Sequence, residues 1–330
     1  MLKLGITTGD PAGIGPEISL RAACGATVRE AGRLVLFGDA DLLRSQGQSL
    51  GLPFDYEILS ADAFRRAGSL PERSIVHVPS GGEGIVPGRG SKAGGDAAAR
   101  NILECAAACK EGRLDAIVTA PISKKYLQEA GYSFPGHTEF LAHLTASPRV
   151  AMAFLTERLK VVLVTIHLPL RIAIDRVTTE SVLETLEITL REFPRLGLPC
   201  RKVAVAGLNP HAGEEGILGS EEKERIEPAL ARARALYPGI DIQGPLPADT
   251  LFYRAVQGEF DVVLALLHDQ GLGPIKLMGF GQAVNVTLGL PFVRTSVDHG
   301  TAFDIAGKGI ARPESMITAI HWARRLVHPH

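Results

Sequence analysis

The clearest sign of the architecture lies in the segment Lys202-Val203-Ala204-Val205-Ala206-Gly207-Leu208-Asn209-Pro210-His211-Ala212-Gly213. After Lys202 comes a short apolar run of valine and alanine, and a polar loop bounded by glycine follows it directly. A short strand that is apolar nearly throughout is typical of a sheet covered on both faces, as in parallel α/β folds. The segment therefore predicts a buried strand over 202–206 that ends in a loop carrying polar side chains.

The same pattern recurs along the chain, with helical segments between the strands. Further strands are predicted over 2–7, 33–38, 75–78, 116–119, 151–155, 159–165, 262–267 and 283–287, and helices over 15–23, 94–111, 180–192, 220–234 and 315–326. Because only three residues separate 151–155 from 159–165, these two strands are predicted to form an antiparallel hairpin. The predicted fold class is therefore α/β with mixed strand directions.

Length and composition narrow the class of protein. A chain of 330 residues, 45 % of them hydrophobic, is long enough for two domains with substantial cores. The net charge of −1 argues against a globally basic nucleic-acid binder, and no apolar run approaches the roughly 18 residues that span a bilayer. Met1–Thr7 shows no export signal, and the four cysteines make no disulfide framework. We expect a cytoplasmic protein that binds neither nucleic acid nor membrane.

Unusual polar residues gather in the loops that follow predicted strands. These loops span 119–124, 166–169, 209–213 and 268–271. In open parallel sheets, ligands bind in the crevice outside the carboxyl ends of the strands. Polar residues at four such ends therefore predict one composite site.

Three histidines, His167, His211 and His268, stand at these strand ends. Neutral imidazole is the commonest protein ligand for zinc and related divalent ions, and three of them leave coordination positions open for a substrate. The alternative for each is a loop histidine bonded to a backbone carbonyl. Asp249 and Asp269 are candidates either for orienting an imidazole or for accepting a proton, and loop capping is the alternative for both.

Lys276, Asn285 and Arg294 form a candidate anion site, because a lysine point charge and an arginine fork together suit phosphate or carboxylate. Taken alone, each is more often a solvated surface residue. The segment Thr8–Glu17 has glycines that let a backbone approach a ligand, but it lacks the third glycine of the dinucleotide fingerprint. The residues alone thus indicate a metal-assisted enzyme acting on an anionic small molecule.

Longer blocks carry a family resemblance over the whole chain. They include Gly9-Asp10-Pro11-Ala12-Gly13-Ile14-Gly15-Pro16-Glu17, Gly136-His137-Thr138-Glu139 and His268-Asp269-Gln270-Gly271, with further blocks over 119–124, 208–214, 244–250 and 285–301. In these blocks the chain resembles the 4-hydroxythreonine-4-phosphate dehydrogenases of pyridoxal phosphate biosynthesis. The loop 297–309 also looks like the dinucleotide-contacting loop of isocitrate and isopropylmalate dehydrogenases. Glu215 and Ile217 depart from the family, where the run after His211 is usually richer in glycine.

The resemblance implies roles for individual residues. It assigns a divalent metal ion (Zn²⁺, Mg²⁺ or Co²⁺) to His167, His211 and His268, substrate contacts to His137, Thr138, Lys276, Asn285 and Arg294, and NAD(P)+ to a loop containing His299, Gly300 and Asp304. It also implies a homodimer whose active site is shared across the interface. The implied fold is two α/β/α domains with mixed sheets and an active-site cleft between them, similar to isocitrate and isopropylmalate dehydrogenases. Residues 1–130 with 295–330 form the first domain, and 131–294 the second.

The implied reaction is oxidation of 4-(phosphooxy)-L-threonine, a phosphorylated hydroxy amino acid, followed by loss of carbon dioxide from the keto acid. Asp249 and Asp269 are the candidates for the catalytic proton transfer. The alternative enzyme is a paralogue that oxidises 4-phosphorylated threonate or erythronate, and another relative oxidises a cis-dihydrodiol dicarboxylate. From a different class, the alternative is a catalytically silent regulator that binds metal and phosphate on the same fold.

Overall fold

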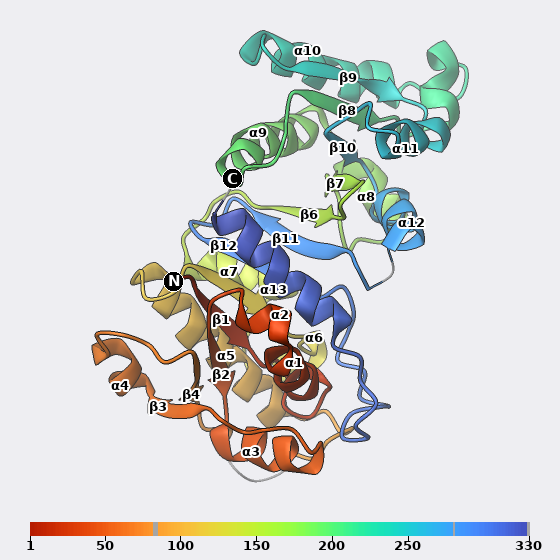
Figure 1. Ribbon diagram of the computed structural model, residues 1–330. Coiled ribbons are helices and arrows are strands. Elements are labelled where there is room, and N and C mark those ends of the chain that lie inside the picture. The colour runs from red at the N-terminus through yellow and green to blue at the C-terminus, as the bar shows by residue number, and fades with distance from the viewer. Residues whose placement is uncertain (82–84, 280, 329–330) are drawn as a thin grey trace. The chain divides into compact units, whose positions relative to one another are not determined.

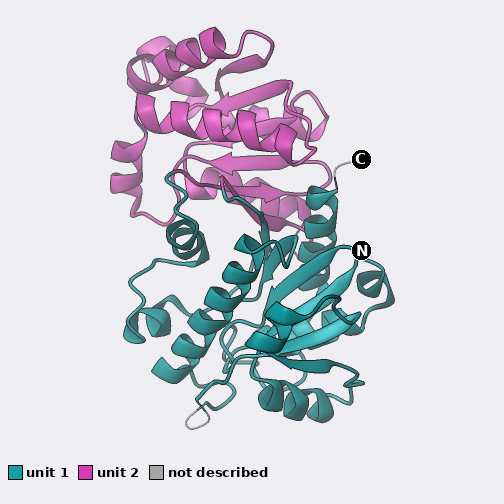
Figure 2. Ribbon diagram, turned by 90° about the vertical axis from the view of Figure 1, so that its left-hand side faces the viewer, with its two compact units in different colours: residues 1–148, 290–328 teal, residues 149–289, 329–330 magenta. Residues whose placement is uncertain are grey.

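The computed structural model describes residues 1–81, 85–279 and 281–328 (Figure 1). The chain divides into two compact units, shown in different colours in Figure 2. Unit 1 comprises Met1–Pro148 with Leu290–His328, and unit 2 comprises Arg149–Gly289. These units meet along the chain at 148/149 and 289/290, whereas the domain boundaries drawn from the sequence lie at 130/131 and 294/295.

Unit 1 is built on a parallel sheet. Its strands are β1 (Lys3–Thr7), β2 (Arg33–Gly38), β3 (Glu57–Ser60), β4 (Arg73–His77), β5 (Ala116–Thr119) and β12 (Val293–Ser296). They pair in the order β3-β4-β2-β1-β5-β12, with every pairing parallel. The central strands are buried along nearly their whole length, which is what a sheet covered on both faces requires.

Helices cover both faces of this sheet (Figure 1). They are α1 (Gly15–Cys24), α2 (Ala26–Arg29), α3 (Ala40–Ser49), α4 (Ala61–Arg66), α5 (Lys92–Lys110), α6 (Lys124–Glu129), α7 (His137–Leu144) and α13 (Glu314–Val327). The helices α1 and α13 pack together, whereas α5 packs on β1, β2 and β5 beside α6 and α7. The connection from β1 through α1 to β2 and the connection from β4 through α5 to β5 run in opposite directions along the sheet. Because such crossovers are right-handed, α1 and α5 lie on opposite faces.

Unit 2 holds a mixed sheet. Its strands are β6 (Ala151–Leu155), β7 (Lys160–Leu163), β8 (Lys202–Ala206), β9 (Asp241–Leu246), β10 (Val262–Ala265) and β11 (Val284–Leu288), and they pair in the order β11-β6-β7-β10-β8-β9. The pairings of β6 with β11 and with β7 are antiparallel, and those among β7, β10, β8 and β9 are parallel. The predicted hairpin and the predicted α/β class are both confirmed.

The helical segments of unit 2 are α8 (Leu170–Arg176), α9 (Thr179–Arg195), α10 (Glu227–Leu236), α11 (Ala248–Val256) and α12 (His268–Gly279), with single turns at Pro210–Gly216 and Glu222–Ile226. Alternate residues of β7, β8 and β10, among them Val161, Ala204 and Val263, form one core with Leu251 of α11 and Ile275 of α12. This core fixes α12, and with it His268, against the sheet.

Two features of unit 2 differ from the sequence prediction. Lys276 was expected to follow a loop over Gly271–Pro274, but it lies in α12, which runs through Pro274. The glycines and the proline favour a loop, and burial of Leu272 and Ile275 overrides that local preference. The strand β9 contains Gly244 and Pro245 and was not predicted, because proline is compatible with a strand only at a sheet edge, where β9 lies.

None of the described helices combines the length and the apolar character needed to cross a membrane.

Gly271 lets α12 lie directly on the sheet. A Cβ atom at this position would come within 2.6 Å of Leu163 Cδ2, 2.9 Å of Val161 Cγ1 and 3.0 Å of Ala265 Cβ. We expect Gly271→Ala to lower the free energy of unfolding by about 1–3 kcal/mol, because an overpacked core must shift. Gly273→Ala on the exposed side of α12, where a Cβ meets open space, is the matched control and should be neutral or stabilising by up to ~1 kcal/mol. Urea denaturation measures both, and equal effects would contradict the packing argument.

Candidate functional site

The three predicted metal ligands follow three neighbouring parallel strands of unit 2. His167 comes after β7, His268 directly after the β10 segment, and His211 after β8, in the strand order β7-β10-β8. Backbone pairing continues past the ends of β7 and β10, since Thr165 N–H and its hydroxyl both donate to the Leu266 carbonyl, at 3.2 and 2.6 Å. The rings of His167 and His268 are consequently side by side, with their centroids 5.5 Å apart.

Carboxylates hold one ring nitrogen of two of these histidines. His268 Nδ1 lies 2.7 Å from Asp269 Oδ1, and His211 Nδ1 lies 3.1 Å from Glu214 Oε2. An ionised carboxylate only accepts hydrogen bonds, so each Nδ1 carries a proton, and in the neutral form of the ring the lone pair then lies on Nε2. Metal-binding histidines are usually oriented in this way, so the donor chemistry fits a divalent ion. Glu214 was not predicted as a site residue.

Gln270 ties the His268 segment to the loop that carries His211. Its side-chain oxygen accepts the Leu266 N–H at 2.8 Å, and its side-chain nitrogen donates to the Gly207 carbonyl at 2.7 Å. Each residue of the predicted motif therefore has its own contact. His268 offers its ring and Asp269 orients that ring. Gln270 links two loops, and Gly271 lets α12 lie close to the sheet. The sequence pattern predicts no role for Gln270.

The predicted ligands are not all brought together. Among the residues that the structure describes, His, Cys, Asp and Glu side chains form no group of three or more that could hold a metal ion, so the three histidines do not form such a group together. A pocket of about 400 Å³ opens at that pair, lined by residues 166–168, 170, 173 and 267–270. Asp249 is exposed in the first turn of α11, which packs beside the turn containing His211.

Unit 1 holds a separate cluster of charge around Arg294. Arg294 lies in β12 and is only 3 % exposed, and its Nε and Nη2 both donate to Thr119 Oγ1, at 3.2 and 2.7 Å. Burial lowers the pKa of Arg294 to about 9, and the Glu139 carboxylate opposes this shift. The guanidinium stays a cation at neutral pH. A guanidinium presents N–H groups in a planar fork that suits phosphate or carboxylate, so Arg294 stays the candidate anion-binding residue of unit 1.

His137 and Thr138 open α7 beside this cluster. Burial lowers the pKa of His137 well below its ordinary value, and the charges of Arg294 and Lys124 lower it further. The imidazole is therefore neutral near pH 7, and its buried Nε2 atom has no hydrogen-bond partner among the residues that the structure describes. Thr138 is buried as well. Buried polar atoms are normally satisfied, so His137 Nε2 is available to a ligand.

The depressed pKa of His137 predicts a pH dependence of stability. Below about pH 6.5 the unfolded chain protonates this imidazole while the folded protein does not, so stability falls as the pH falls, by at most about 1.4 kcal/mol per pH unit. Denaturant midpoints between pH 7.5 and 5.5 should fall less for His137→Asn than for the wild type. His143→Asn, an exposed position of the same helix, should retain the wild-type slope. A slope that is identical in wild type and His137→Asn would contradict the assignment.

The remaining predicted substrate contacts lie in unit 2. Lys276 stands on α12 and Asn285 in β11, where it pairs with Phe154 of β6, and both are half-buried. The prediction that Asn285 lies in a strand is confirmed.

The predicted cofactor loop is anchored to the first glycine-rich segment of unit 1. Ile14 N–H donates to the Thr301 carbonyl at 2.9 Å, and the fully buried Glu17 accepts the Ala311 N–H at 3.0 Å. Arg21 Nη2 donates to the Gly309 carbonyl at 2.6 Å. His299 Nδ1 lies 3.1 Å from the Gly300 carbonyl, and Gly300 and Asp304 are exposed. The loop thus has a fixed backbone and presents exposed polar groups.

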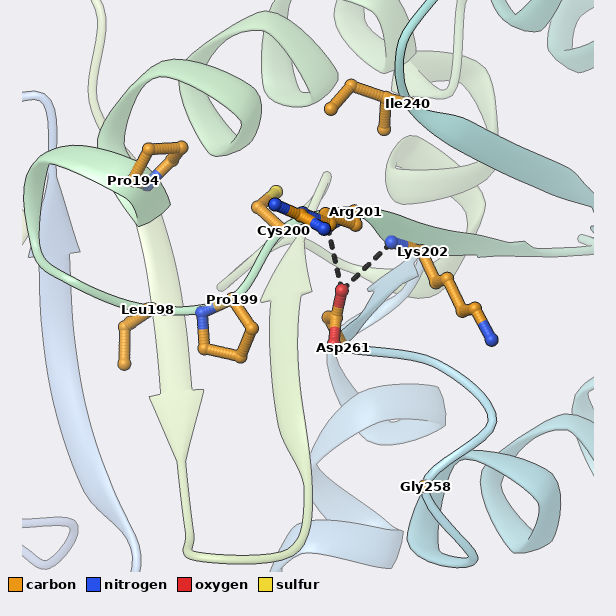
Figure 3. A pocket seen from close by; sticks show the side chains of 9 residues that line it. All are labelled: Pro194, Leu198, Pro199, Cys200, Arg201, Lys202, Ile240, Gly258 and Asp261. Atoms are coloured by element: carbon orange, nitrogen blue, oxygen red, sulfur yellow. Dashed lines mark hydrogen bonds between the residues drawn. The ribbon is translucent and has the colours of Figure 1, made fainter.

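A second pocket of unit 2, of about 490 Å³, lies where β8 and β10 begin rather than where they end (Figure 3). Its carboxylate, Asp261, accepts the backbone N–H groups of Arg201 and Lys202, at 2.7 and 2.9 Å. None of the predicted site residues lines it. Asp261 therefore joins the starts of the two strands, and the candidate site remains at their carboxyl ends.

Known proteins resemble this chain over nearly its full length. A 4-hydroxythreonine-4-phosphate dehydrogenase of Marinobacter nauticus is 48 % identical over 324 residues, covering 96 % of this chain and 93 % of the relative. A D-threonate 4-phosphate dehydrogenase of Cupriavidus necator is 43 % identical over 326 residues, covering 98 % and 96 %. A crystal structure of the Klebsiella pneumoniae 4-hydroxythreonine-4-phosphate dehydrogenase is 42 % identical and superposes with a TM-score of 0.88, covering 99 % of this chain and 100 % of that one.

These matches define the class of protein as an enzyme, an oxidoreductase with a mixed α/β fold. Residues 30–323 also match the family model described as pyridoxal phosphate biosynthetic protein PdxA. The chain belongs to this family, as the resemblance in its sequence blocks predicted.

Proposed function

We propose that this protein oxidises the 3-hydroxyl of 4-(phosphooxy)-L-threonine, with NAD(P)+ and a divalent metal ion, in pyridoxine 5′-phosphate biosynthesis. The hydroxyl loses its proton, and C3 gives a hydride to the nicotinamide. The resulting 2-amino-3-oxo-4-(phosphooxy)butanoate then loses carbon dioxide and takes up a proton at C2 to give 3-amino-2-oxopropyl phosphate. Three histidines at the ends of neighbouring strands, in a chain of this family, carry the proposal.

The metal would be held by His167, His211 and His268. When bound, such an ion lowers the pKa of a neighbouring hydroxyl and stabilises negative charge on its oxygen. Asp269 orients His268 through the 2.7 Å contact at Nδ1, and Glu214 does the same for His211. Asp249, whose carboxylate is exposed, is our candidate for accepting the hydroxyl proton.

The substrate phosphate would be bound by cationic and polar side chains that the family assigns to it. Arg294 offers a buried guanidinium, and His137 offers a neutral ring with an unsatisfied Nε2. Lys276, Asn285 and Thr138 complete the assignment. A bidentate guanidinium gives both charge and geometry to phosphate recognition. The loop with His299, Gly300 and Asp304 would contact the nicotinamide cofactor, and its anchoring by Ile14 and Glu17 supports a fixed binding surface.

A second substrate is supported by a specific observation, the 43 % identity to the D-threonate 4-phosphate dehydrogenase. The two substrates share the phosphate and the oxidised hydroxyl and differ in the amine or hydroxyl at C2. We therefore test NAD(P)H formation with 4-phospho-L-threonine and 4-phospho-D-threonate side by side, before and after chelation. Metal-dependent turnover of the amino acid alone is the expected result. Preference for the threonate would indicate an enzyme of sugar-acid oxidation. Binding of NAD+ without turnover of either substrate would contradict both assignments.

We also propose that the enzyme is a homodimer in which the partner completes this site. The apolar side chains of Leu168, Leu170 and Ile172 are exposed directly after His167, and Leu170 is 64 % exposed. Exposed apolar groups beside a polar site are typical of an interaction surface. Sedimentation at decreasing concentration, with activity measured in parallel, tests the proposal, and a fully active monomer would refute it.

A further inference from the structure

The turn that carries His211 has an unusual backbone. Residues 211–215 all have positive φ, with values of 51°, 54°, 82°, 44° and 58°. Only Gly213 among them is a glycine, and a left-handed conformation costs roughly 1–2 kcal/mol for each residue with a Cβ. Four such residues within one turn of five are stable only where the surroundings over-determine their conformation.

A single buried carboxylate supplies that constraint. Glu222 is 2 % exposed and begins the π-type turn Glu222–Ile226. Its Oε1 accepts the N–H groups of Leu208 and Asn209, at 2.8 and 2.7 Å, and its Oε2 accepts the side-chain amide of Asn209 at 2.9 Å. These two residues immediately precede Pro210 and His211. Three N–H donors thus offset the cost of burying the charge.

The same carboxylate lies against the left-handed turn itself. A Cβ atom on Gly213 would stand 2.8 Å from Glu222 Oε2. The turn therefore packs tightly against Glu222. This one side chain holds the residues that lead into the turn and also contacts the turn at Gly213. The hydrogen bonds of Glu222 go to Leu208 and Asn209, so it acts on the His211 ring through the backbone of the turn.

We propose that Glu222 is a positioning residue for the metal site: it holds the left-handed turn that presents His211, and it thereby sets the affinity for the ion. The inference rests on the proposed function, because it takes His211 to be a metal ligand. Residues that orient ligands from behind typically change metal affinity by 10–100-fold when they are replaced.

The experiment is a titration of the metal-free full-length enzyme with CoCl₂, followed by calorimetry and by the visible absorption of Co²⁺ at a temperature well below unfolding. Glu222→Gln is expected to weaken Co²⁺ binding about 10–100-fold and to change the absorption spectrum. Glu224→Gln, on the same turn and exposed, should stay within about twofold of the wild type. A merely structural role for Glu222 would lower the melting temperature but leave affinity and spectrum unchanged.

Two further variants distinguish a failure of the proposed metal site from a failure of the proposed role of Glu222. If His211→Ala binds Co²⁺ like the wild type, His211 is not a ligand and the proposed metal site itself is wrong. If His211→Ala loses the metal while Glu222→Gln keeps wild-type affinity and spectrum, the positioning role is overturned and the metal site stands. Should Glu222→Gln fail to fold, Gly213→Ala presses on the same carboxylate from the turn, and unchanged Co²⁺ affinity in that variant would equally overturn the inference.

Discussion

His268→Ala is expected to lower metal-dependent turnover by about 10³-fold or more, because a Lewis acid contributes several kcal/mol to the barrier and each 1.36 kcal/mol is a factor of ten. Among the three proposed ligands, His268 has the best-defined setting. Its ring stands beside His167, its Nδ1 is held by Asp269, and its backbone continues from a buried strand. The measurement is NADH or NADPH formation at saturating substrate and metal.

Two control variants test whether the loss of turnover comes from the His268 ring itself. Asp269→Asn keeps the ring and weakens only its orientation, so we expect a smaller loss of about 10–100-fold. His143→Ala, an exposed histidine of α7, should retain wild-type turnover. Circular dichroism establishes that each variant is folded. If His268→Ala kept normal turnover that chelation still abolished, the ion would have to bind elsewhere, and the three-histidine assignment would be wrong.

The strand ends that carry these histidines were predictable from the sequence because the signal is local. An apolar run followed by a glycine-bounded polar loop needs no knowledge of the tertiary structure. The strand β8 has the bounds predicted for it, whereas β7 and β10 each end two residues earlier than predicted. The residues that support the histidines were not predictable in this way. Gln270 bonds to Gly207 only because β10 and β8 are neighbours, and strand order is a long-range property.

Buried polar strands mark another limit of sequence patterns. The strand β12 reads Val293-Arg294-Thr295-Ser296, and all four residues are buried although three are polar. Hydrophobic periodicity cannot detect such a strand, so Arg294 was predicted as an anion-binding residue without its strand. Likewise, the glycines and Pro274 of α12 predict a loop, and only packing on the sheet makes them helical. In both cases, close packing at the site overrides the local preference.

Arg294→Lys is expected to raise KM for the phosphorylated substrate by about 10–100-fold, although the charge is retained. Hydrogen bonds to charged groups are worth about 1.5–3 kcal/mol each, and 1.4 kcal/mol corresponds to a factor of ten. A lysine ammonium cannot reproduce the planar fork or the paired contacts to Thr119. His77→Ala removes an acceptor of the Ala40 N–H at the end of β4 and should change KM far less.

The choice of substrate distinguishes the proposed phosphate-binding role of Arg294 from a general loss of folding. If the guanidinium binds phosphate, wild type and Arg294→Lys should differ strongly on the phosphorylated substrate and little on the same hydroxy acid without its phosphate. A folding defect would instead affect both substrates alike and would lower the melting temperature. Equal KM effects of Arg294→Lys and His77→Ala would remove Arg294 from the anion site. The buried guanidinium would then have a structural role in unit 1, where it donates to Thr119 and where the Glu139 charge opposes the effect of burial on its pKa.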